Sequence, residues 1–188
     1  MAILPSYDIK ELENRMRASI EAYKRELSGL RTGRASAHLL DPVQVSVYGS
    51  RMPLNQLATI TTPEPRMISV QVWDRSNVVS AEKAIREANL GVNPQVDGQI
   101  IRLPLPAPTA ERRTELIKQA HKYAETHRVA VRNVRRDGLD LLKKLEKEGK
   151  IGEDDHKKNS AKIQDLTDRL IKEIDQILSS KEAEIQKV

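Results

Sequence analysis

A cluster of arginines near the middle of the chain is the strongest candidate for chemistry. Residues 127–136 read HRVAVRNVRR and include no acidic side chain. The cluster consists of Arg128, Arg132, Arg135 and Arg136. If the surrounding segment is helical, each residue advances by about 100°, and the four side chains share one stripe about 100° wide. A guanidinium group keeps its charge and donates paired hydrogen bonds to a phosphate, so the stripe predicts a solvent-facing polyanion site.

Other interpretations of this stripe stay open. Most runs of charge are solvated helix faces, so the chain could be a coiled-coil adaptor that binds protein, with its arginines as plain surface. Between residues 125 and 136 the one acidic residue is Glu125, and this scarcity of acidic partners within the stripe favours the polyanion site. Base stacking on single-stranded RNA is disfavoured, because aromatic residues make up only 3% of the chain.

Composition narrows the class of protein. A chain of 188 residues can form one large domain or two small ones, and its net charge of +5 favours an acidic partner. It has no cysteine, which excludes disulfides and thiolate metal sites. The sequence shows no signal peptide or apolar run of membrane length, so we expect a cytoplasmic protein without membrane contact.

No motif in the chain indicates an enzyme. A phosphate loop, a glycine-rich dinucleotide turn and zinc-type histidine spacing are all missing from the sequence, and its four histidines are scattered. We therefore expect no catalytic residue, no metal site and no cofactor. His127 falls towards the apolar side of the arginine-bearing segment, where we expect a packed or hydrogen-bonded histidine rather than a base.

Three long helices are expected to position the stripe. Residues 8–30 carry apolar side chains at steps of three and four residues, a coiled-coil seam, with Asp8 as the start signal. The arginine-bearing helix follows Thr109, a plausible N-cap, and runs for about 38 residues, or about 57 Å. Its expected core positions are Leu116, Ala120, Tyr123, Val131, Val134, Leu141 and Leu145. Gly138 lies on this apolar arc, where close approach of another helix would offset its poor helix propensity.

The last helix opens with three acidic residues from Glu153, which suit the positive end of a helix dipole. Its expected seam is Ile163, Leu166, Leu170, Ile174 and Ile177.

The region between the first two helices has a different pattern. Alternation at Val43–Val47 and Ile68–Val72 predicts half-buried strands, separated by a proline-rich stretch. Residues 79–89 predict a short helix, and residues 99–103 a last strand. Residues 35–107 carry six basic and six acidic side chains, so the basic surplus lies outside this region.

We therefore predict an α+β protein, in which a three-helix antiparallel bundle carries an inserted small α/β domain. The bundle is expected to comprise residues 1–31 and 107–188, and the inserted domain residues 32–106. Two strands of chain would connect the two domains and form a hinge, near 32–34 and near 104–106. The expected hinge residues are Thr32, Gly33, Pro104, Leu105 and Pro106.

Short motifs along the whole chain make it resemble the bacterial ribosome recycling factor family. They are RTGRAS at 31–36, PLNQLA at 53–58, DRS at 74–76, EKAI at 82–85, LGVNP at 90–94, IRLPLP at 101–106, ERR at 111–113, RVAVRNVRRD at 128–137 and EDD at 153–155. Each motif alone is weak, but nine in this order are specific.

The resemblance implies an L-shaped monomer that binds the 70S ribosome after termination, with its bundle along large-subunit ribosomal RNA. With elongation factor G, which supplies GTP hydrolysis, family members split the ribosome into subunits. The RNA-contacting arginines of the family match Arg31, Arg34, Arg132 and Arg135 here. Arg128 and Arg136 join them in the expected RNA-binding set because they share the helical stripe. Trp73 stands where the family is expected to have Phe or Tyr.

Overall fold

The computed structural model describes residues 7–188, which form two compact units. The helical unit contains the described residues up to Leu30 together with Arg113–Lys187, and the α/β unit contains Arg31–Arg112 and Val188. Each unit has its own apolar core. The expected bundle range began at residue 1, and its first six residues lie outside the described part of the chain. Among residues 7–188, no helix is both long and apolar enough to cross a membrane.

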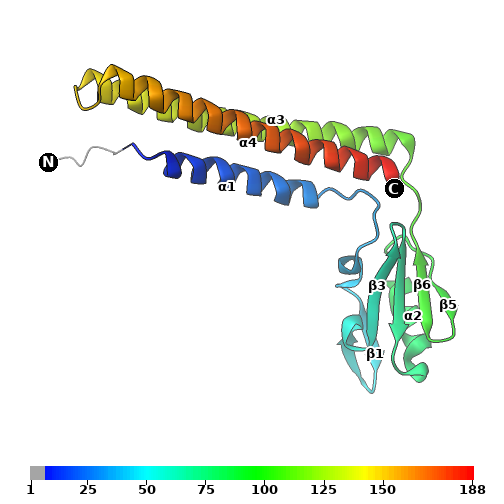
Figure 1. The fold of residues 1–188 in the computed structure, drawn as a ribbon. Coiled ribbons are helices and arrows are strands. Elements are labelled where there is room, and N and C mark those ends of the chain that lie inside the picture. The colour runs from blue at the N-terminus through cyan, green and yellow to red at the C-terminus, as the bar shows by residue number, and fades with distance from the viewer. Residues whose placement is uncertain (1–6) are drawn as a thin grey trace. The chain divides into compact units, whose positions relative to one another are not determined.

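The first helix of the helical unit, α1 (Ile9–Ser28), follows the predicted seam. The Asp8 carboxylate caps it by accepting a hydrogen bond from the Lys10 amide at 2.9 Å. The seam residues at the centre of the helix are all buried, namely Leu12, Met16, Ile20, Tyr23 and Leu27. Because this face is apolar at coiled-coil spacing, it packs onto the other two helices of the unit, and Figure 1 shows the three running side by side.

The other two helices, α3 (Ala110–Lys147) and α4 (Glu153–Lys187), form an antiparallel hairpin. Thr109 caps α3, since its hydroxyl accepts a hydrogen bond from the Arg112 amide at 3.1 Å. Gly149, with φ of +70°, turns the chain between the two helices. The acidic first turn of α4 begins at Glu153, as predicted.

The core face of the hairpin differs from the predicted face at three positions. The predicted Tyr123 of α3 is half-buried, and the neighbouring Ala124 is buried in its place. In α3, Leu142 is fully buried and Leu141 is only half-buried. In α4, Leu178 is buried, whereas the predicted Ile177 is half-buried. A straight helix drifts by about 20° per heptad relative to a strict seven-residue repeat, so the buried position moves by one residue over several turns.

Gly138 lies in the core of the helical unit, at a close helix contact. A Cβ atom at this position would lie 2.6 Å from Leu12 Cδ1 of α1 and 3.1 Å from Ile163 Cδ1 of α4. The expected close approach is confirmed, and it explains why a residue with poor helix propensity stands in the middle of a long helix.

The α/β unit contains a two-stranded and a four-stranded antiparallel sheet. The small sheet pairs β1 (Gln44–Val47) with β2 (Ser50–Pro53). The larger sheet has the order β3-β4-β6-β5, made of β3 (Ala58–Glu64), β4 (Met67–Val72), β5 (Gln95–Asp97) and β6 (Ile100–Pro104). The helix α2 (Val78–Glu87) contacts β1 and β6. Three short 3₁₀ helices complete the unit, at Ala37–Leu40, Leu54–Gln56 and Arg75–Asn77.

Strand β3 was not predicted, because the sequence there contains prolines. Pro63 is tolerated because β3 is an edge strand, and the pairing with β4 shifts register between Thr61 and Glu64. A proline cannot donate a ladder hydrogen bond, so it is confined to such edges and irregularities.

Both chain segments expected to form the hinge are tied to the turn between β3 and β4. The Ala35 amide donates to the Pro65 carbonyl at 2.7 Å, and the Leu105 amide donates to the Arg66 carbonyl at 2.8 Å. Pro104 is the last residue of β6, and Thr32 is buried. Leu105 is therefore anchored to the α/β unit, and the hinge itself stays a prediction.

Candidate nucleic-acid interface

Helix α3 places the four arginines of the stripe on consecutive turns of the helical unit. Arg132 and Arg136 are exposed, whereas Arg128 and Arg135 are half-buried. The structure therefore brings the four side chains to one region but gives them different surroundings.

Arg128 is held between two helices and faces solvent with only 19% of its side chain. Its Nε and NH2 atoms donate to Asp175 Oδ1 of α4 at 2.9 and 2.5 Å, and its NH1 atom donates to Glu125 Oε2 at 3.1 Å. Although burial lowers the pKa of Arg128, the hydrogen bonds that Arg128 donates to Asp175 and Glu125 outweigh this effect and raise the pKa. The prediction that all four guanidinium groups face solvent is wrong for Arg128.

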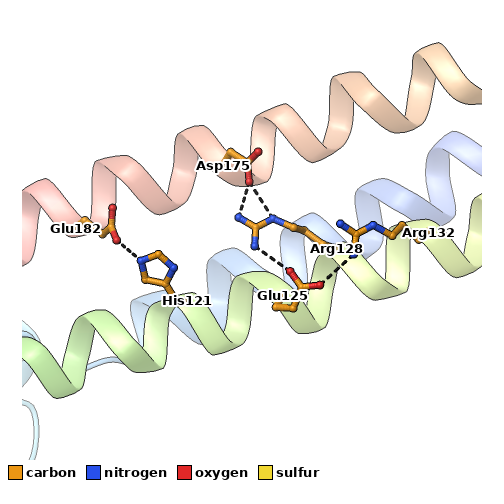
Figure 2. A network of polar contacts seen from close by, with 6 residues as sticks. All are labelled: His121, Glu125, Arg128, Arg132, Asp175 and Glu182. Carbon is orange, nitrogen blue, oxygen red and sulfur yellow. Dashed lines mark hydrogen bonds and ion pairs between the residues drawn. The ribbon is translucent and has the colours of Figure 1, made fainter.

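Arg132 keeps 46% of its side chain exposed and shares Glu125 with Arg128. Its NH1 atom donates to Glu125 Oε1 at 3.0 Å (Figure 2). The hydrogen bond from Arg128, followed by that from Arg132, lowers the pKa of the Glu125 carboxyl. Glu125 is therefore a stable anion between two cations.

Arg135 and Arg136 carry the charge that the structure leaves uncompensated. Among residues 7–188, neither forms an ion pair with an acidic side chain. The Nε atom of Arg135 is buried and finds no acceptor within the described chain. Arginines without an acidic partner in the described chain are suited to an anion that approaches from outside.

Arg31 and Arg34 lie in the α/β unit, and both are exposed. The six predicted RNA-binding residues are thus divided between the two units, with four on α3 and two on the segment that follows α1.

Asp175 is the member of the arginine network that sequence reasoning missed. It lies 47 residues from Arg128, on α4, so helical spacing within α3 could not reveal it. The sequence indicated this pair only indirectly, through the prediction of two antiparallel helices joined by a tight turn, which brings such distant positions together.

His127 of α3 is packed against α1, as expected. It is buried, with Nδ1 3.0 Å from Ser19 Oγ and Nε2 3.1 Å from Glu26 Oε2. Its ring centroid lies 5.5 Å from that of Tyr23. With both nitrogens engaged by α1, His127 joins the two helices and is not placed to act as a base.

The chain is similar to one protein family over nearly its whole length. The family model described as ribosome recycling factor matches residues 23–185. A ribosome-recycling factor from Rhizorhabdus wittichii is 60% identical over 182 residues, which cover 97% of this chain and 98% of the relative.

Two solved structures are similar to the chain as well. The first is a solution structure of a ribosome recycling factor, with a TM-score of 0.64, 46% identity and coverage of 95% of both chains. The second is a model of the T. thermophilus ribosome recycling factor, bound with E. coli elongation factor G to the E. coli post-termination complex. Its TM-score is 0.56 at 45% identity, covering 94% of this chain and 96% of that one.

Proposed function

Since this chain belongs to the ribosome recycling factor family, a family of non-enzymatic translation factors, we propose how it performs recycling. It binds the post-termination ribosome through large-subunit ribosomal RNA and, with elongation factor G and GTP, splits it into subunits. The similar structure bound to a post-termination complex with elongation factor G supports this assignment of partners. We expect subunit splitting to take place in the cytoplasm and the chain to act as a monomer.

The uncompensated cations of α3 are the observation that carries RNA binding. Arg135 and Arg136 have no acidic partner in the described chain, and Arg132 is half exposed. Their guanidinium groups lie within two turns of one helix, a spacing that suits successive phosphates of an RNA backbone. Arg31 and Arg34 add two exposed cations from the α/β unit.

A salt series tests this proposal directly. Each phosphate that a cation neutralises releases counterions, with a log–log slope of about −0.9 per contact. If Arg31, Arg34, Arg132 and Arg135 contact phosphates, ribosome binding should fall with a slope of about −3 to −4. A flat response would refute RNA binding and favour the coiled-coil adaptor.

Single variants test the individual contacts. Arg135→Ala should weaken ribosome binding by about 1–3 kcal/mol, because a charge-assisted hydrogen bond to phosphate is lost. Arg169→Ala is the matched control, since it removes the same charge from an exposed arginine of α4. Equal losses of ribosome affinity in both variants would mean that Arg135 contributes only through the net charge of the protein and makes no specific contact.

The purified chain alone should hydrolyse neither GTP nor ATP, because elongation factor G supplies that step.

Movement between the two units is the remaining part of the proposal. The connecting segments that remain for a hinge are short, because the backbone amides of Ala35 and Leu105 are hydrogen-bonded to the β3–β4 turn within the α/β unit. Gly33 has φ of +82°, a conformation that strains any other residue. Gly33→Ala should therefore impair subunit splitting far more than ribosome binding. Gly49→Ala, at φ of +75° in the β1–β2 turn, is the control for strain alone. Normal splitting by Gly33→Ala would contradict a hinge there.

A further inference from the structure

Glu125 occupies the side of Arg132 that faces Arg128. Its two carboxylate oxygens accept one hydrogen bond from each arginine, at 3.1 Å from Arg128 NH1 and 3.0 Å from Arg132 NH1 (Figure 2). The Glu125 carboxylate thus already binds Arg132, one of the arginines that we assign to RNA binding.

Arg128 fixes this carboxylate in place. Its own Nε and NH2 atoms are taken by Asp175 of α4, and its side chain is four-fifths buried. An arginine held on one edge by a second helix has little freedom, so the carboxylate bonded to its other nitrogen is held as well. Arg128 is therefore a positioning residue for Glu125 and no longer a candidate for direct contact with RNA.

A phosphate that binds Arg132 must share the guanidinium group with this carboxylate. If both anions bond to neighbouring nitrogens of one guanidinium group, their oxygens lie about 5 Å apart. At that separation in water, the repulsion between two unit charges weakens binding by about fourfold.

We propose that Glu125 is a built-in competitor of RNA for Arg132, which limits affinity for the ribosome and speeds release. The proposal rests on the proposed function, in which Arg132 contacts an RNA phosphate. A factor that acts repeatedly must leave the RNA after each round, and a fixed internal anion supplies part of the driving force for release. Asp175 and Arg128 hold the competitor at the arginine.

Glu125→Gln tests the proposal, because it removes the charge and keeps the shape. We expect the dissociation constant for ribosomes to fall by about threefold to fivefold, mainly through slower dissociation. The matched control is Asp140→Asn, which removes the same charge from an exposed carboxylate of α3 that has no ion pair within the described chain. Unchanged or weaker binding by Glu125→Gln, or equal tightening by Asp140→Asn, would overturn the proposal.

A double-mutant cycle separates this inference from the proposed function. In an Arg132→Ala background, Glu125→Gln should no longer tighten binding beyond the effect of Asp140→Asn, because the arginine for which the two anions compete is gone. If Arg132→Ala binds like the wild type, the RNA contact and the inference both fail. If Arg132→Ala weakens binding but the tightening by Glu125→Gln persists in that background, the inference alone fails. Helix content measured by circular dichroism should stay unchanged throughout.

Discussion

Replacement of Arg128 by methionine should destabilise the helical unit without removing an RNA contact. Arg128→Met keeps most of the aliphatic stem and deletes the three hydrogen bonds to Asp175 and Glu125. A hydrogen bond to a charged group contributes about 1.5–3 kcal/mol when it is buried. Asp175 and Glu125 are each about half exposed and regain water when Arg128 is lost, so the net loss should be smaller. We expect the free energy of unfolding to fall by about 1–2 kcal/mol.

The assay is denaturation of the full chain, followed by circular dichroism at the helix signal, with Arg136→Met as control. Arg136 is exposed and has no ion pair in the described chain, so its replacement should change the free energy of unfolding by less than about 0.5 kcal/mol. Ribosome binding should respond in the opposite order, with Arg136→Met the weaker binder. If Arg128→Met is as stable as the wild type and binds ribosomes as poorly as Arg135→Ala, then Arg128 is a phosphate ligand and its structural role is refuted.

Three further predictions concern the core of the helical unit and the pH dependence of its stability. Gly138→Ala should lower the free energy of unfolding by about 1 kcal/mol, because the clash of the new Cβ with Leu12 Cδ1 at 2.6 Å outweighs the gain in helix propensity. In a Leu12→Ala background, which removes the clashing atom, Gly138→Ala should instead raise the free energy of unfolding. Tyr23→Phe should leave stability at neutral pH unchanged or raise it by up to about 1 kcal/mol, since the Tyr23 hydroxyl is buried without a partner in the described chain. Burial raises the pKa of Tyr23 to about 12, so the wild type should lose stability as the pH rises from about 10 to 12 and Tyr23→Phe should lose less, as alkaline denaturation can measure. Hydrogen bonds from Arg128 and Arg132 lower the pKa of Glu125, so the ion pairs of Glu125 stabilise the fold above its unfolded-state pKa and are lost as the pH falls through its folded-state pKa. The stability difference between wild type and Glu125→Gln, measured by urea denaturation, should therefore shrink below about pH 4.5.

Local chemistry allowed much of the fold to be predicted. Asp8 and Thr109 cap their helices as expected, and α4 begins at its acidic turn. The five central positions of the predicted α1 seam are buried, whereas Ile9 and Leu30 at its two ends are half-buried. These features depend on neighbours three or four residues away, so the chain specifies them without knowledge of its tertiary contacts.

Other features were decided only by tertiary structure. The pairing of β3 along a sheet edge makes a strand of a proline-containing segment. The sequence by itself determined that four arginines share one region of a helix, because helical period fixes their phase. Which of them are available to RNA was decided by Asp175 on the neighbouring helix, since an ion pair forms wherever packing brings opposite charges within reach, however far apart they lie in the chain.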